Sequence, residues 1–138
     1  MLDSIGDNMV DVAMVGAGQT KFGNHPLGLK GMWSETIEKA ISSVDHDFQS
    51  TDVEEAFIGS IAFGGSQLGN TAALLTEHSG MEGVSVRRVE NACASSGFAL
   101  RDAWMAIKSG SGCCRCRWHR EDERPLCFTK AILAGCIR

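Results

Sequence analysis

Cysteine is the side chain in this sequence with the widest chemistry, and its distribution separates two regions. Cys93 is the single cysteine of residues 1–110. Residues 111–138 instead crowd five cysteines around a histidine: Cys113, Cys114, Cys116, His119, Cys127 and Cys136. A thiolate is both a nucleophile and a soft metal ligand. Cys93 therefore suggests covalent catalysis, whereas the later cluster suggests a zinc site.

The surroundings of Cys93 favour a nucleophile at a strand-to-helix turn. The run Val84–Val89 predicts a strand before it, and apolar residues at helical spacing from Phe98 to Ile107 predict a helix after it. The positive end of a helix dipole stabilises a thiolate at such a turn, and the small residues 92–97 leave room for an acyl chain. A lone cysteine is also often a small buried side chain without chemistry, and this interpretation stays open.

The elements that must position Cys93 are three strands alternating with three helices. The strands are short apolar runs closed by turn residues, and the helices repeat apolar residues at three- and four-residue spacing. The predicted order is buried strand Val10–Val15, helix Leu29–Val44, buried strand Ala56–Ala62, helix Leu68–Ser79, strand Val84–Val89 and helix Phe98–Lys108. Such alternation predicts an α/β fold with a mostly parallel sheet and helices on both faces.

Length and charge narrow the possible partners. The 138 residues suffice for one domain with one core, and their formal net charge of −4 divides into −7 for residues 1–110 and +3 for residues 111–138. An acidic body without a basic stripe argues against nucleic acid, and the apolar runs are far shorter than the roughly 18 to 20 residues that cross a bilayer. With no secretion signal in the sequence, we expect a cytoplasmic protein that binds neither nucleic acid nor membrane.

Two segments in register resemble the thiolase superfamily, particularly its archaeal and sterol-carrier-protein-like members. Val12–Gly23 (VAMVGAGQTKFG) resembles the opening of these proteins, and Val89–Gly97 (VENACASSG) resembles their nucleophile motif. The resemblance covers about residues 9–110 and implies an incomplete N-terminal half-domain of the thiolase fold. It also implies that Cys93 accepts the acyl group of an acyl-CoA thioester, with its own backbone N–H helping to hold the developing oxyanion.

The resemblance further implies the reaction and its reactants. The family transfers an acyl group between acyl-CoA and coenzyme A or a carbon nucleophile through a cysteine thioester. Acyl-CoA is therefore the expected substrate, and neither a metal nor a covalently bound cofactor is expected. Intact members are homo-oligomers, and Gly64–Asn70 resembles their dimer contact beside the active site, although an ordinary glycine turn explains its composition equally well.

No general base for Cys93 is assigned in this chain. The family draws its activating histidine, its second cysteine and most coenzyme A contacts from sequence beyond anything present here, so we expect this chain alone to be inactive. His25 is expected in a solvent-exposed turn, His46 at a helix end and His78 in the last turn of another helix. All three are interpreted as surface side chains without a catalytic role.

Residues 111–138 are interpreted as a tail read in a shifted frame, which sets the domain boundary at residue 110. Codons for Cys and Arg, read one base later, encode chiefly Val, Ala, Asp, Glu and Gly, the composition expected of a buried strand and turn. Trp118 followed by His119 forces a glycine in that frame, where the family pattern has one. Without apolar periodicity over its charged segment, the tail is expected to be disordered or poorly packed.

Two other functions stay open at this point. The Cys/His cluster of the tail allows a non-enzymatic zinc-binding interaction module, because a Cys-x-x-Cys turn with a nearby histidine provides suitable soft ligands. Residues 1–110 also allow a thiolase-like domain without catalysis. Elemental analysis for bound zinc distinguishes the zinc-binding module from an acyltransferase.

Overall fold

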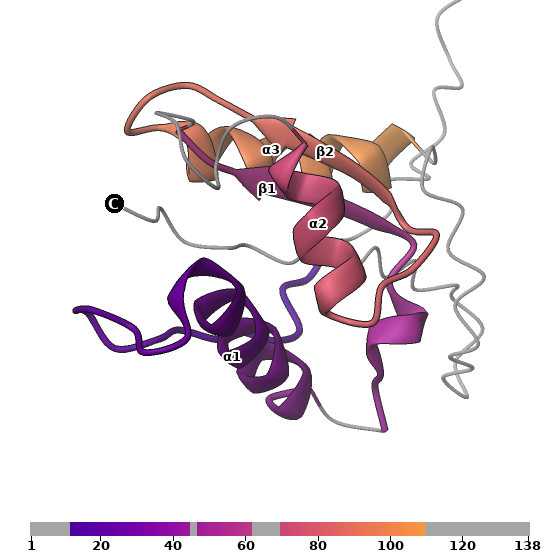
Figure 1. The fold of residues 1–138 in the computed structure, drawn as a ribbon. Helices are drawn as coiled ribbons and strands as arrows, with labels where there is room; N and C mark the ends of the chain where they lie inside the picture. Colours follow the sequence, from indigo (N-terminus) through magenta and orange to yellow (C-terminus); the bar gives the residue numbers. More distant parts are fainter. Residues whose placement is uncertain (1–11, 45–46, 62–69, 110–138) are drawn as a thin grey trace, which may run out of the picture.

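A computed structural model describes residues 12–44, 47–61 and 70–109 of the chain (Figure 1). Its elements, in order, are α1 (Gly28–Ser42), the 3-10 turn η1 (Ser50–Asp52), β1 (Glu55–Gly59), α2 (Thr71–His78), β2 (Ser85–Val89) and α3 (Ser95–Ser109). The three predicted helices and the second and third predicted strands are confirmed, with bounds that differ by a few residues. The helix before Gly80 begins later than predicted, with Asn70 as its N-cap.

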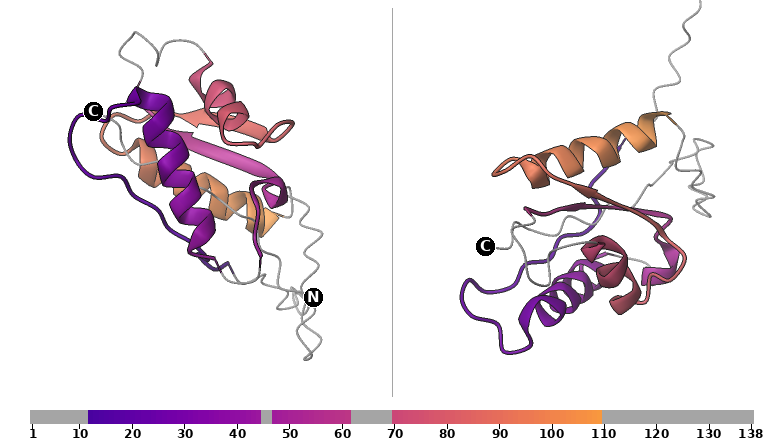
Figure 2. Two further views of the ribbon diagram at one scale, coloured as in Figure 1. Left: turned by 60° about the horizontal axis from the view of Figure 1, so that its bottom comes forward. Right: turned by 45° about the horizontal axis from the view of Figure 1, so that its top comes forward.

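The two strands pair in parallel and carry helices on both faces, as predicted for an α/β fold. The register runs from Glu55 opposite Ser85 to Gly59 opposite Val89. Because parallel neighbours need a crossover, α2 lies between them in the chain. Figure 2 shows α3 along one face of the sheet and α1 with α2 on the other.

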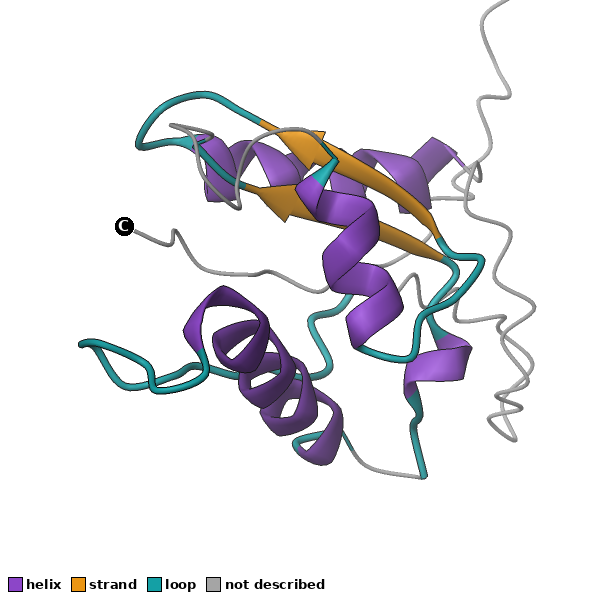
Figure 3. Cartoon of the chain, in the orientation of Figure 1, coloured by secondary structure: helices purple, strands orange, loops and turns teal. Residues whose placement is uncertain are grey.

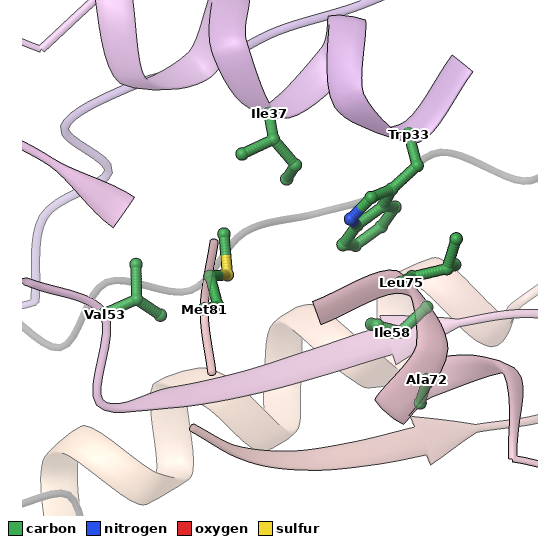
Figure 4. Close-up of a cluster of buried hydrophobic side chains, with 7 residues drawn as sticks. All are labelled: Trp33, Ile37, Val53, Ile58, Ala72, Leu75 and Met81. Carbon is green, nitrogen blue, oxygen red and sulfur yellow. The ribbon is translucent and has the colours of Figure 1, made fainter. Parts of the chain in front are cut away.

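The α1 side of the sheet holds a cluster of large apolar side chains (Figure 4). It joins α1, α2 and β1 with the segments beside them, and its buried members are Trp33, Ile37, Val53, Ile58, Ala72, Leu75 and Met81. Burying a large apolar side chain contributes about 1.5 to 3 kcal/mol. This cluster is therefore the main source of stability among the described elements.

The α3 side is built from small residues instead. Phe57 of β1 packs against Ala99, Ala103 and Ala106 of α3. Phe57 and its neighbour Ile58 point to opposite faces, because successive side chains of a strand alternate. All five residues of β1 are consequently buried, which explains why its sequence from Ala56 to Ile58 is apolar without alternation.

The glycine predicted to end the second helix does so through its backbone conformation. Gly80 has φ +71°, and its N–H donates to the Glu77 carbonyl at 3.2 Å. The Met81 N–H reaches back to the Thr76 carbonyl at 3.0 Å, which completes a Schellman motif. Met81 then joins the core cluster on the α1 side of the sheet.

The prediction of a buried strand at Val10–Val15 is wrong for its described residues, 12–15. They form no strand, and the Met14 side chain is 70% exposed. The segment that follows lies along α1 and is bound through its backbone: the Ala17 N–H donates to Oγ of Ser43, the C-cap residue of α1, at 2.9 Å, and Lys39 Nζ donates to the Gln19 carbonyl at 3.1 Å. At Gly18 a Cβ would lie 2.1 Å from the Thr36 carbonyl oxygen, so only a glycine allows this approach. Contacts with a helix thus replace the expected sheet ladder.

Several predictions fall on residues outside the described ranges. They concern residues 10 and 11, His46, positions 64–69 of the glycine-rich segment and the whole tail from 111 to 138. Within the described ranges, no helix is both long and apolar enough to span a bilayer.

Candidate functional site

Cys93 lies on the short connection between β2 and α3, at the carboxyl end of the parallel strands. Figure 3 shows this connection as the loop that leaves the arrowhead of β2 and enters α3. Its thiol is free and exposed. Ligands of open α/β sheets bind outside the carboxyl ends of the strands, so the predicted nucleophile stands at the edge where such folds place reactive groups.

The loop turns sharply at Ala92, the residue before Cys93. Ala92 has φ 44°, in the left-handed region, and its N–H donates to the Glu90 carboxylate at 3.1 Å. The Ala94 N–H then donates to the Asn91 carbonyl at 2.9 Å, and the Ser95 N–H to the Ala92 carbonyl at 3.2 Å. These consecutive turns wind the chain directly into α3 with Cys93 at their tip.

The Ser95 hydroxyl closes the inner side of this loop. Its side chain is 1% exposed. The oxygen accepts the Asn91 N–H at 2.8 Å, and the hydroxyl donates to the Ala92 carbonyl at 2.7 Å. Sequence reasoning treated Ser95 only as a small neighbour of Cys93 and missed these bonds.

Gly59 brings the start of α3 against the end of β1. A Cβ on Gly59 would lie 2.7 Å from both the Cα and the backbone nitrogen of Ser96, a clash with main chain that cannot move aside. Gly59 ends a fully buried strand, and a glycine at such a position often marks a close backbone approach. That signal was present in the sequence, although the partner of the contact was not.

The first turn of α3 gives the site its electrostatic character. The N–H groups that open a helix lack partners within that helix and carry partial positive charge, so they favour negative charge at the position of Cys93. Farther along the sheet the buried Glu55 carboxylate pairs with Arg87, which also lies 5.1 Å above the Phe57 ring. This pair joins the two strands and neutralises a buried charge below α3.

His25 is held by hydrogen bonds at the beginning of α1. The turn predicted there is confirmed, because the Gly28 N–H donates to the His25 carbonyl at 3.0 Å. The turn is exposed at Pro26 and Leu27 as predicted, whereas the His25 side chain within it is 15% exposed. Its Nδ1 accepts the Leu27 N–H, which leaves Nε2 to donate to the Glu35 carboxylate at 3.0 Å. These two bonds draw the ring onto the beginning of α1.

The Glu35 carboxylate also binds Lys39 at 2.6 Å, one helical turn away. The hydrogen bond from Lys39 lowers the pKa of Glu35 below its usual value, and the hydrogen bond from His25 adds to this. The third predicted surface histidine, His78, is exposed in the last turn of α2 as expected. Residues 12–44, 47–61 and 70–109 contain no group of three His, Cys, Asp or Glu side chains placed to hold a metal ion.

Comparison with known proteins agrees with this geometry. Residues 12–114 match the family described as "Thiolase, N-terminal domain". A protein named acetyl-CoA acetyltransferase from Methanocaldococcus jannaschii is 36% identical over 107 residues, which cover 75% of this chain and 26% of the relative. Another of that name, from Methanothermobacter thermautotrophicus, is 35% identical over 104 residues, or 74% of this chain and 27% of the relative. The chain thus spans about a quarter of the length of these curated relatives.

Proposed function

Because this chain belongs to the family of thiolase N-terminal domains, we propose that Cys93 is the nucleophile of a thiolase-type acyltransferase. The observation that supports this most directly is the exposed thiol before the first turn of α3, at the carboxyl end of the parallel strands. Relatives that carry the name acetyl-CoA acetyltransferase favour an acyl-CoA thioester as substrate. By the family resemblance, the intact enzyme is proposed to be a homo-oligomer.

The proposed chemistry begins when the Cys93 sulfur, as thiolate, attacks the carbonyl carbon of the acyl-CoA thioester. A new carbon–sulfur bond forms, and the carbonyl oxygen takes up the negative charge. The Cys93 N–H can donate a hydrogen bond to this oxyanion and stabilise it. The bond to the coenzyme A sulfur then breaks, and coenzyme A leaves as a thiolate that takes up a proton. The acyl group remains on Cys93 until a carbon nucleophile or coenzyme A accepts it.

We propose that the base which takes the Cys93 proton in an intact enzyme comes from a segment that corresponds to the unmatched part of the relatives. His25, His46 and His78 are not assigned this role, and the His25 ring is bonded to Glu35 of α1. A nucleophile without its base and second oxyanion donor loses several orders of magnitude in rate. We therefore expect no measurable steady-state cleavage of a 3-ketoacyl-CoA by this chain. Turnover that disappears in Cys93→Ala would contradict this expectation.

Single-turnover acylation tests the nucleophile itself. The full chain is incubated with acetyl-CoA, digested, and analysed by mass spectrometry for acetyl groups on each cysteine-containing peptide. We expect acetylation of the peptide containing Cys93 to exceed that of the five tail cysteines, and to be lost when the protein is denatured before labelling. Uniform labelling of all six cysteines, or none on Cys93, would overturn the proposed role.

For residues 111–138 we propose a shifted reading frame rather than a zinc module. The support is their composition, their opposite charge, and a family match that ends at residue 114. DNA sequencing across codons 105–138, from an independent isolate of the source organism, is expected to restore a thiolase-like continuation after a one-base change near Gly110. An unchanged frame together with one zinc ion per purified chain would instead support the zinc-binding module.

A further inference from the structure

Ala92 carries the backbone strain of the candidate site. Of the described residues other than glycine, Asp47 and Ala92 have positive φ values, 54° and 44°. Aspartate is enriched in this region because its short polar side chain can bond to the nearby backbone, whereas alanine has no such group. The conformation of Ala92 must therefore be held by its surroundings, and such strain concentrates at functional sites.

The Ser95 hydroxyl supplies that support. Its two hydrogen bonds reach the Asn91 N–H and the Ala92 carbonyl, so one buried oxygen joins the peptide groups that flank the Asn91–Ala92 unit. The Ala92 carbonyl belongs to the same peptide plane as the Cys93 N–H. In a planar trans peptide these two groups point in opposite directions. A carbonyl drawn toward the buried Ser95 hydroxyl thus turns the Cys93 N–H away from the interior of the loop.

We propose that Ser95 is a positioning residue, whose hydroxyl holds the 92–93 peptide so that the Cys93 N–H is presented to the acyl oxygen of the substrate. This inference rests on the proposed role of Cys93. Ser95 itself touches neither substrate nor reacting atoms, and it acts through the peptide group that it orients. Glu90 assists from the other side, because its carboxylate accepts the Ala92 N–H.

The neighbouring serine provides a matched control. Ser96 lies in the same first turn of α3, and its Oγ is buried without a hydrogen-bond partner in the described part of the chain. Replacing either serine by alanine removes one hydroxyl from the same turn. Only the replacement at 95 removes the bonds to the loop before Cys93.

Two reagents applied to the full chain separate orientation from simple loss of structure. Acetyl-CoA requires a donor for the developing oxyanion, whereas iodoacetamide reacts with an accessible thiol and develops no oxyanion. Rates at Cys93 are measured for both by peptide mass spectrometry. In Ser95→Ala we expect acetylation to slow by about tenfold or more, as for loss of an oxyanion donor, while alkylation changes by less than about twofold. Ser96→Ala is expected to leave both rates within about twofold of the parent.

Three results would overturn the role of Ser95. The first is equal slowing of both reactions in Ser95→Ala, and the second is no slowing of either reaction in that variant. The third is a loss of acetylation in Ser96→Ala as large as that in Ser95→Ala. If Ser95→Ala does not fold, hydrogen exchange of the parent protein decides: the Asn91 amide must exchange more slowly than in a peptide of residues 89–97, and equal rates reject the proposal. Failure of the parent Cys93 to be acetylated would instead overturn the proposed function. If Cys93 is acetylated rapidly in the parent and equally rapidly in Ser95→Ala, the positioning role of Ser95 is rejected and the proposed role of Cys93 remains.

Discussion

The two faces of the sheet are packed by opposite means. On one face, α1 and α2 bury large side chains such as Trp33 and Leu75, and on the other, α3 meets Phe57 with alanines. Small contact residues let a helix backbone approach a strand closely, and Gly59 extends that approach to the first turn of α3. The first face supplies stability through buried area, while the second fixes the position of the helix start that follows Cys93. Removing volume should therefore harm the first face, and adding volume should harm the second.

The largest expected effect comes from removing volume on the α1 side. Trp33 is 2% exposed, and Trp33→Ala should lower the free energy of unfolding by about 3 to 5 kcal/mol because it leaves a cavity in the main core. Urea denaturation followed by circular dichroism measures this change. Trp104 of α3 is 45% exposed and provides the same substitution as a control. A loss in Trp104→Ala as large as that in Trp33→Ala would contradict the comparison.

Adding volume on the α3 side should have an intermediate effect on stability and a direct effect on Cys93. Gly59→Ala forces the strand end and the first turn of α3 apart, at a cost of about 1 to 3 kcal/mol. Because this shift moves the connection that carries Cys93, acetylation by acetyl-CoA should slow as well. Denaturation and peptide mass spectrometry on the same variant measure the two effects.

The control is Gly97→Ala, also on the α3 side. A Cβ there meets nothing within 4 Å, and the position is helical. Alanine should therefore stabilise the helix by about 0.5 to 1 kcal/mol, because it replaces a poor helix former. If Gly97→Ala lowers the free energy of unfolding as much as Gly59→Ala does, the loss does not come specifically from added volume at the contact between α3 and β1, and the comparison fails.

The smallest expected effect concerns pH and the surface of α1. The bonds from Lys39 and His25 lower the pKa of Glu35 in the folded state, so the ionised carboxylate stabilises the fold above its unfolded pKa, near 4.5. This contribution is lost as pH falls through the lower, folded pKa. Glu35→Gln should thus be less stable than the parent near neutral pH, and the difference should shrink below about pH 4.5. Thermal melts in dilute buffer, with Glu38→Gln as control, measure it; a difference that grows on acidification would contradict the assignment.

Local patterns in the sequence determined the elements that present Cys93. Apolar runs and helical spacing predicted β1, β2 and the three helices, and a single glycine, Gly80, predicted the end of α2. These signals are local, since periodicity and backbone freedom depend on neighbours within a few residues. The turn between β2 and α3, and with it the place of Cys93, followed from the same reasoning.

Only the tertiary structure decided which groups meet. The apolar run after Val12 has the composition of a strand, but here the backbone that follows it is bound by Ser43, the C-cap residue of α1. The partners of Ser95 depend on the positive φ of Ala92, which composition does not reveal. The close approach at Gly59 depends on where α3 crosses β1, because Gly59 and its contact Ser96 lie 37 positions apart in sequence. Such contacts join backbone segments that are distant in sequence or strained, and the pattern of side chains along the sequence does not predict them.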